Sequence, residues 1–158
     1  MTSENSAPSA KIRLARPEEA DRLTRLAMTA KASWGYDEAF MAMCRAELTL
    51  TPEKMNAWTI WVAECVGEIV GMIALASKGL SGEVEDFMVD PDFQGRGLGA
   101  ALMGALLDEC RARGLQTIGL DADPNAEGIY QRLGLTTVGQ SPSRSIPGRM
   151  LPRMVLAV

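Results

Sequence analysis

The sequence predicts one domain of the α/β (or α+β) class with a mixed β-sheet. Segments with strand and helix patterns follow each other in the order β-α-α-β-β-β-α-β-α-β-β. A strand, a helix and a strand in succession in the second half imply parallel neighbours joined by a right-handed crossover. Strands that lie close together in the middle of the chain imply antiparallel hairpins. The two arrangements together require a mixed sheet.

The N-terminal part begins with a strand and two helices. Residues 11–15 alternate as a short strand. Pro17 followed by two acids is typical of a first helical turn, and apolar residues then recur at helical spacing over residues 20–30. Residues 33–36 break this helix, and a second helix is expected over residues 37–48.

The remaining elements alternate between strands and helices. In order, they are a turn at 51–52, strands at 59–65, 68–77 and 84–89, a helix at 98–113, a strand at 117–120, a short helix at 125–133, and strands at 136–138 and 154–157. A hairpin near Gly67 joins the first two of these strands, and Gly114 caps the long helix. Three prolines and one glycine indicate a loop over residues 141–152.

Length, composition and charge fit one globular domain without a membrane segment. A chain of 158 residues buries a core without disulfide or metal staples, and we expect residues 11–158 to form that core. Residues 1–10 are polar and lack the pattern of a secretory signal, so they are expected to be a disordered tail. The longest apolar run, 69–76, is too short for a membrane helix. The net charge of −4 argues against nucleic acid as a partner.

The chain contains no histidine and three cysteines. Without histidine, Ser-His and Cys-His nucleophile pairs are excluded, and proton transfer near neutral pH falls to other side chains or to water. Cys44, Cys65 and Cys110 are far apart in apolar contexts, which favours reduced core thiols and argues against a zinc site. We therefore expect a cytoplasmic protein without a metal.

A glycine-rich stretch between the third predicted strand of the middle section and the long helix is the strongest local signal. Glycines before a helix allow backbone N–H groups to approach an anion, and the helix N-terminus adds partial positive charge, so a phosphate is the natural ligand. The purely structural alternative is a glycine-rich turn that only caps the helix. The residues of this stretch are Gln94, Gly95, Arg96, Gly97, Leu98, Gly99 and Ala100.

Two other phosphate-binding motifs compete for the same glycines. A Walker loop is excluded because it requires a lysine that this stretch lacks. Gly95, Gly97 and Ala100 fit the dinucleotide fingerprint, with Asp121 at the distance of a ribose ligand. Against it, residues 90–94 separate the glycines from the strand, and the 59 residues after Gly99 are too few for a doubly wound sheet.

Two motifs together resemble the GNAT family of N-acetyltransferases. The stretch QGRGLG at 94–99 matches Q/R-x-x-G-x-G/A, and residues 83–90 are similar to the strand that precedes it in that family. The stretch DPNAEGIYQRLGL at 123–135 resembles N-x-x-A-x-x-[LI]-Y-x-x-x-G-[FL]. The resemblance implies a mostly antiparallel sheet of six to seven strands with a parallel, splayed central pair, flanked by about four helices.

The resemblance also implies how acetyl-CoA binds. The glycine stretch wraps the pyrophosphate, and strands that diverge after Val89 expose backbone groups to the pantetheine. Asp123 stands where the family usually has Asn, and Asn125, two residues later, is expected to supply the amide. The implied cofactor-binding residues are Phe87, Met88, Val89, Gln94, Gly95, Arg96, Gly97, Leu98, Gly99, Ala100, Asn125 and Tyr130.

Acetyl transfer to an amine needs a base for the amine and an acid for the leaving thiolate. The resemblance implies Tyr130 as the acid; the alternative is an aromatic that packs on its helix. The base is expected to be a carboxylate, acting directly or through water, or solvent itself, and among the carboxylates Glu85 is favoured over Glu83. The alternative is that both glutamates are solvated or bind an acceptor ammonium. Alternation predicts two faces of this strand, one with Glu83, Glu85, Phe87 and Val89 and the other with Val84, Asp86, Met88 and Asp90.

Two segments are expected to bind the acceptor. The break between the first helices places Trp34, Tyr36 and Asp37 together, and the late loop carries Arg149. A guanidinium holds a carboxylate and carboxylates hold an ammonium, so a small zwitterionic or amino-acid-like amine is expected. The alternative is that Arg149 only fixes its loop or meets a CoA phosphate.

Three functions remain open at this point. The first is an acetyl-CoA-dependent N-acetyltransferase that acts on the primary amine of a small molecule. The second is a non-catalytic acyl-CoA-binding sensor or scaffold of the same fold, and the third is a small dinucleotide-binding protein. Proteins similar to this one are often dimers, so a homodimer is expected.

Overall fold

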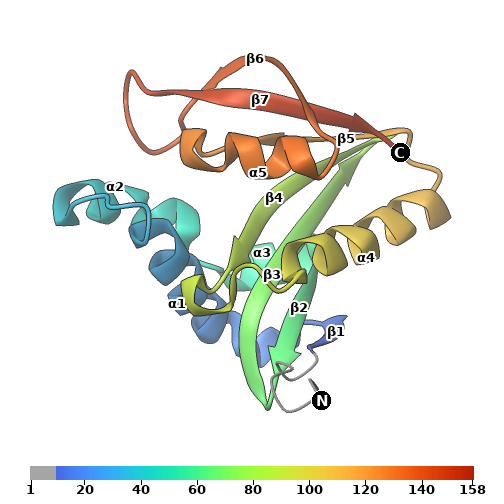
Figure 1. Ribbon diagram of the computed structural model, residues 1–158, viewed down its shortest axis with the longest axis horizontal. Coiled ribbons are helices and arrows are strands. Elements are labelled where there is room, and N and C mark those ends of the chain that lie inside the picture. Colours follow the sequence, from blue (N-terminus) through green and yellow to red (C-terminus); the bar gives the residue numbers. More distant parts are fainter. Residues whose placement is uncertain (1–9) are drawn as a thin grey trace, which may run out of the picture.

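Figure 1 shows the computed structural model, which describes residues 10–158. Within this part of the chain, seven strands form one sheet in the order β1-β2-β3-β4-β5-β7-β6. Only β4 and β5 pair in parallel, and the other neighbours are antiparallel. The strands are β1 (Lys11–Leu14), β2 (Thr59–Cys65), β3 (Glu68–Lys78), β4 (Ser81–Val89), β5 (Thr117–Asp121), β6 (Thr136–Pro142) and β7 (Met150–Ala157).

This architecture confirms the predicted class, a mixed and mostly antiparallel sheet with a parallel central pair. The doubly wound parallel sheet of a dinucleotide-binding protein is therefore excluded. The helices are α1 (Ala20–Ala32), α2 (Glu38–Leu48), α3 (Pro52–Ala57), α4 (Leu98–Ala112) and α5 (Glu127–Arg132), with short 3₁₀ turns η2 (Pro17–Glu19), η3 (Pro91–Phe93) and η4 (Pro124–Ala126).

Helices cover both faces of the central strands because those strands are apolar on both sides. Along β3, Ile73 and Leu75 belong to the core that α4 covers, whereas Met72 and Ala74 belong to the core under α1. A third cluster joins α1 to α2. In Figure 1, α1 and α2 lie to the left of β4 and α4 lies to the right of β2 and β3. The sheet thus separates two cores, and β4 contacts both.

The structure differs from the predicted elements mainly after residue 135. Strands β6 and β7 are longer than predicted, so the loop between them shortens to residues 143–149. The turn predicted at 51–52 is the start of α3, which Thr51 caps by accepting a hydrogen bond from the backbone N–H of Lys54. The predicted tail at 1–10 lies outside the described residues except for Ala10, which packs against the core.

Cys44, Cys65 and Cys110 are buried and form no disulfide, as predicted. Over residues 10–158, no helix is long and apolar enough to cross a membrane.

Candidate active site

The glycine stretch forms a loop that opens into α4. Asp90 accepts a hydrogen bond from the backbone N–H of Asp92 at 2.9 Å and fixes η3 before it. Gly95 and Gly97 have φ of 78° and 80°, a left-handed conformation that glycine adopts without strain. Gly97 is the N-cap of α4, and no side chain caps the helix there. The backbone N–H groups of the first turn are therefore available to an anion.

The parallel strands β4 and β5 separate next to this loop. Their pairing runs only from Ser81 to Glu83 on β4, opposite Thr117 to Gly119 on β5. The predicted point of divergence, after Val89, is therefore wrong, since β4 already leaves its partner after Glu83. A β-bulge at Glu85 follows directly after the paired residues, and a bulge bends its strand and increases the twist. Backbone groups along the rest of this edge of β4 are free to bind a ligand.

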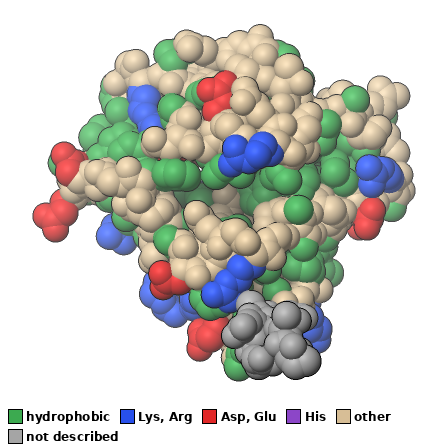
Figure 2. Space-filling view, in the orientation of Figure 1, with side chains coloured by type: hydrophobic (Ala, Val, Ile, Leu, Met, Phe, Trp, Pro, Cys, Tyr) green, Lys and Arg blue, Asp and Glu red, His purple; other side chains and the backbone are tan. Residues whose placement is uncertain are grey.

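A cavity of about 400 Å³ occupies the space between the separated strands. Its wall includes the glycine loop and Tyr130 on one side and residues of α1 and α2 on the other. Figure 2 shows a hollow in the middle of this face of the molecule, with hydrophobic side chains around it. The cavity therefore connects a candidate phosphate site to a chamber beneath α2.

Tyr130 lies in the wall of this cavity. Its ring stacks on Phe87 of β4 with ring centroids 5.6 Å apart. Its hydroxyl makes no hydrogen bond within the described part of the chain. Burial, and then the negative charges of Asp123 and Asp86, raise its pKa, so the phenol stays protonated at neutral pH. This arrangement is what a proton donor in the cavity requires.

The carboxylates of β4 do not follow the predicted alternation. Ala74 of β3 pairs with Asp86 and Leu75 pairs with Val84, so Glu85 is an extra residue in a β-bulge. The bulge changes the parity of the strand. Val84, Phe87 and Val89 all pack in the α4 core, and the predicted division of faces is wrong. Glu83 and Asp86 share the opposite face, because both lie opposite residues of that face in β3.

The two glutamates proposed as bases contact arginines. Glu83 accepts two hydrogen bonds from Arg153, at 2.6 and 2.8 Å. Glu85 pairs with Arg144 at 3.4 Å and lines the cavity. Burial raises the pKa of Glu85 above its ordinary value, while Arg144 acts in the opposite direction. Glu83 does not line this cavity.

Asp86 is the carboxylate that sequence reasoning did not select. It lines the cavity and is 8% exposed. Burial raises its pKa to about 7, and the positive charge of Lys54 opposes this rise. Alternation correctly placed Asp86 on the face away from Phe87 and Val89 but separated it from Glu83, and no sequence signal identifies the bulge that puts the two on one face.

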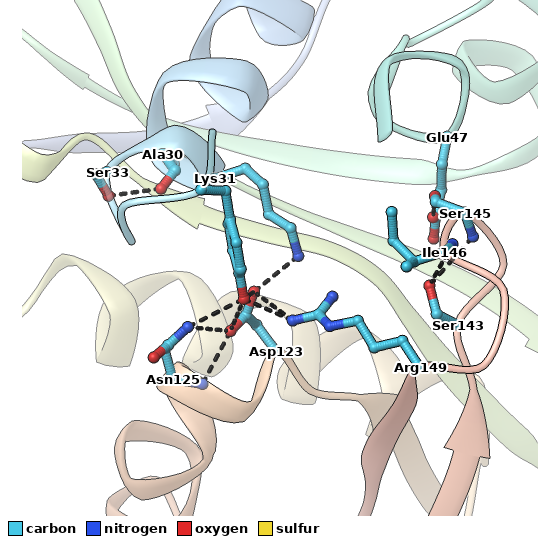
Figure 3. A network of polar contacts seen from close by, with 11 residues as sticks. Ala30, Lys31, Ser33, Glu47, Asp123, Asn125, Ser143, Ser145, Ile146 and Arg149 are labelled. Carbon is cyan, nitrogen blue, oxygen red and sulfur yellow. Dashed lines mark hydrogen bonds and ion pairs between the residues drawn. The ribbon is translucent and has the colours of Figure 1, made fainter. Parts of the chain in front are cut away.

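A network of charged and aromatic residues closes the cavity on the side of the β6–β7 loop (Figure 3). Asp123 accepts hydrogen bonds from Lys31 at 2.7 Å and from the Tyr36 hydroxyl at 2.9 Å. Arg149 donates to the Tyr36 hydroxyl at 2.5 Å, lies 3.7 Å from Asp123, and stacks over the Tyr36 and Phe40 rings. We call Lys31, Tyr36, Phe40, Asp123 and Arg149 the clasp.

The clasp explains why Asp123 replaces the amide that the motif usually carries. Burial raises the pKa of Asp123, but the hydrogen bond and charge of Lys31 outweigh burial, so the pKa lies below its ordinary value. An ionised carboxylate at this place balances two cations. The side-chain NH₂ group of Asn125 donates hydrogen bonds to Tyr36 and Asp123. Asn125, which was predicted to contact the cofactor, is therefore hydrogen-bonded to the clasp instead.

Of the other residues predicted to bind the acceptor, Trp34 lines the cavity and Asp37 does not. Trp34 is 37% exposed. The carboxylate of Asp37 caps α2 by accepting a hydrogen bond from the backbone N–H of Phe40 at 2.8 Å. The guanidinium of Arg96 lies over the Phe93 ring, 4.7 Å from its centroid.

Residues that the sequence reasoning missed complete the chamber beneath α2. Glu47 and Cys44 of α2 line it, and Ser145 of the β6–β7 loop donates a hydrogen bond to Glu47. Lys31 lines it from α1. No motif connects these positions, since the fold alone brings them together. No group of three or more potential metal-ligating side chains occurs among residues 10–158.

Comparison with known proteins identifies the class to which this fold and site belong. Residues 24–147 match the family model of the acetyltransferase (GNAT) domain. The mycothiol acetyltransferase of Beutenbergia cavernae is 30% identical over 139 residues, which cover 82% of this chain and 46% of the relative. The chain belongs to the GNAT family. It spans less than half of the length of the curated relatives it matches.

Solved structures show the same fold over nearly the whole chain. A GCN5-related N-acetyltransferase from Rhodopseudomonas palustris has a TM-score of 0.79 at 22% identity and covers 97% of this chain and 98% of its own. The PaiA N-acetyltransferase of Thermoplasma acidophilum, solved in complex with coenzyme A, has a TM-score of 0.78 at 16% identity and covers 95% and 99%.

Proposed function

We propose that this protein transfers an acetyl group from acetyl-CoA directly to the primary amine of a small molecule. The observation that carries the proposal is the loop with Gly95 and Gly97 in left-handed conformations, which opens α4 beside the free edge of β4. A phosphate at this helix N-terminus and a pantetheine along the strand edge fit that geometry. The coenzyme A complex of the Thermoplasma acidophilum PaiA enzyme supports the choice of cofactor.

The cavity supplies the groups that the transfer requires. Acetyl-CoA brings an acetyl thioester, and the free backbone groups of β4 hold it beside Tyr130. Tyr130 donates a proton to the leaving thiolate, because its hydroxyl has no other partner in the described structure and burial keeps the phenol protonated. A carboxylate of β4 takes the proton of the amine, either directly or through water.

A non-catalytic acyl-CoA sensor is the competing function for this fold. Such a protein needs the glycine loop but has no need of a buried, unpaired carboxylate and a free tyrosine hydroxyl in one cavity. Both groups line the cavity here, as Asp86 and Tyr130. This combination favours turnover over binding alone.

An acceptor screen with detection of free CoA tests the proposal. Purified protein is mixed with acetyl-CoA and a panel of small amines, amino acids and short peptides, and thiol release is followed. We expect CoA release with at least one small amine and none without acceptor. Tight CoA binding without release in any mixture indicates a sensor and contradicts the proposal.

A further inference from the structure

Asp86 has a buried carboxylate oxygen without a partner. Its Oδ2 is the one buried side-chain nitrogen or oxygen in the described part of the chain that makes no hydrogen bond. An unsatisfied buried polar group costs roughly 1–3 kcal/mol, and more when it is charged. The packing of β4 does not require it, since apolar residues occupy the neighbouring positions of this face. The oxygen therefore points to a ligand that the chain itself does not supply.

The position of Asp86 relative to the cavity supports that reading. It lies on the face of β4 toward α1 and α2, and it lines the chamber together with Glu47 and Met88. The other two carboxylates of β4 already contact guanidinium groups, Glu83 that of Arg153 and Glu85 that of Arg144. Asp86 is thus the one β4 carboxylate lining the chamber that no cation of the described chain contacts.

Charged groups on several neighbouring elements act on Asp86, and Lys31 of α1 lines the same cavity. Lys54 of α3 and Arg144 of the β6–β7 loop are positive, and Glu47 of α2 and Glu85 of β4 are negative. Tyr130 of α5 lies close enough for the charge of Asp86 to raise its pKa. None of these groups is hydrogen-bonded to Oδ2 of Asp86. A bound ammonium would supply both the missing hydrogen bond and the missing charge.

We propose that Asp86 is a catalytic residue that binds the ammonium group of the acceptor and takes its proton. The inference rests on the proposed function and names the class of acceptor, a cationic amine with an apolar body and no carboxylate beside the amine. Cys44, Leu48 and Met88 offer the apolar body a wall. A carboxylate on the acceptor would meet Glu47 and Glu85, while the guanidinium of Arg149 is engaged in the clasp.

The proton balance of the transfer follows from these positions. The acceptor arrives as R–NH₃⁺ and gives one proton to Asp86, which later releases it to water. The neutral amine forms a bond to the thioester carbonyl carbon, and the carbon–sulfur bond breaks. The thiolate takes a proton from Tyr130. The second proton lost by nitrogen returns to Tyr130 through water, so the products are the amide, CoA–SH and one free proton.

The test compares Asp86→Asn with Glu85→Gln, two isosteric changes on the same strand. We expect Asp86→Asn to lower kcat by roughly 100- to 10,000-fold, the range for general bases. The profile of kcat/KM against pH should rise to a plateau with a midpoint near 7 in the unmodified protein and in Glu85→Gln. In Asp86→Asn this rise should be absent. CoA affinity, measured by calorimetry, should be unchanged in both variants.

Paired acceptors test the substrate class in the same assay. Each amine, such as an arylalkylamine, is compared with the amino acid that carries a carboxylate beside the same amine. We expect the unmodified protein to prefer the amine by at least tenfold in kcat/KM. Normal kcat in Asp86→Asn, or a preference for the amino acids, overturns this inference and leaves the proposed function standing. Absence of CoA release from the unmodified protein with every acceptor contradicts the function itself.

Discussion

At the scale of single residues, Tyr130 combines burial, a stacked ring and a hydroxyl without a partner in the described structure. Tyr130→Phe keeps the stacking on Phe87 and removes only the hydroxyl. We expect turnover to fall roughly 10- to 1,000-fold, because the leaving thiolate loses its proton donor. Acetyl-CoA affinity, measured by calorimetry, should change little. Unchanged turnover in this variant would show that Tyr130 has only a packing role.

Gly97 carries the second residue-scale prediction. Its φ of 80° strains any other L-residue, although a Cβ there would meet no atom within 4 Å. Gly97→Asp should abolish acetyl-CoA binding because it adds strain and a negative charge at the anion site. Gly104→Ala, in the middle of the same helix, is the matched control and should raise stability by about 1 kcal/mol with binding intact. Calorimetry with CoA and urea unfolding distinguish the two; wild-type affinity in Gly97→Asp rules out the loop as the phosphate site.

The sequence allowed prediction of those site residues whose geometry is local. Gly97 and Tyr130 belong to short motifs in which spacing along the chain determines position, and both line the cavity. Asp86 was not selected, because alternation separated it from Glu83, whereas one bulged residue at Glu85 puts the two on the same face. The clasp could not be predicted either, since Lys31, Asp123 and Arg149 are far apart in sequence.

At the scale of elements, the clasp fastens the β6–β7 loop to α1 and α2. Arg149 contributes stacking on two rings and a hydrogen bond to Tyr36, with its side chain 18% exposed. Arg144, in the same loop, is 62% exposed and makes one long ion pair. We expect Arg149→Ala to lower the free energy of unfolding by about 2 kcal/mol and Arg144→Ala by at most about 0.5 kcal/mol.

Urea unfolding at neutral pH measures both arginine variants. Arg149→Ala should also free the loop over the acceptor chamber, which should raise KM for the amine more than it changes acetyl-CoA affinity. Equal stability of the two variants would mean that the clasp does not hold the loop. A loss of turnover confined to acceptors with a carboxylate would instead assign Arg149 to the acceptor, as first predicted from the sequence.

The bounds of the two strands beside this loop could not be predicted from the sequence. Prolines at 142, 147 and 152 indicated a loop over residues 141–152, yet Pro142 ends β6 and Pro152 lies within β7. Pro152 pairs with Gln140 at this place, although proline gives the ladder no N–H donor. Long-range pairing therefore overrode the local proline signal. The parallel pairing of β4 and β5 is likewise shorter than the family resemblance implied, since it ends at Glu83, just before the β-bulge at Glu85.

At the scale of the whole molecule, the order of elements and two motifs were enough to predict the sheet and its parallel pair. Nearly continuous burial along β2 and β3 requires helices on both faces, and the chain has helices before and after these strands to supply them. What sequence could not supply is the cavity, because its walls come from α1, α2, β4, α5 and the β6–β7 loop at once. Only the assembled fold places Asp86 and Tyr130 in one space.

The buried carboxylate of Asp86 makes a prediction about the stability of the whole molecule. Its pKa is about 7 in the folded protein and near 4 in the unfolded chain. Between these values the folded state binds the extra proton, so the free energy of unfolding falls as pH rises from about 4 to about 7 and then levels. Asp123 acts in a separate window, because its pKa is lowered and its contribution is lost only as pH falls below 4.

The difference between the parent protein and Asp86→Asn isolates this effect. We expect the two to be about equally stable at pH 4, and the variant to be more stable at pH 8 by up to about 4 kcal/mol, three pKa units of linkage. Asp108→Asn, an exposed aspartate on α4, is the control and should give a flat difference across the range. Urea unfolding at one-unit pH intervals measures all three. A flat difference for Asp86→Asn would mean that the carboxylate ionises as readily in the folded chain as in the unfolded one. The ionised carboxylate would then be stable without a bound ammonium, which would contradict its proposed role.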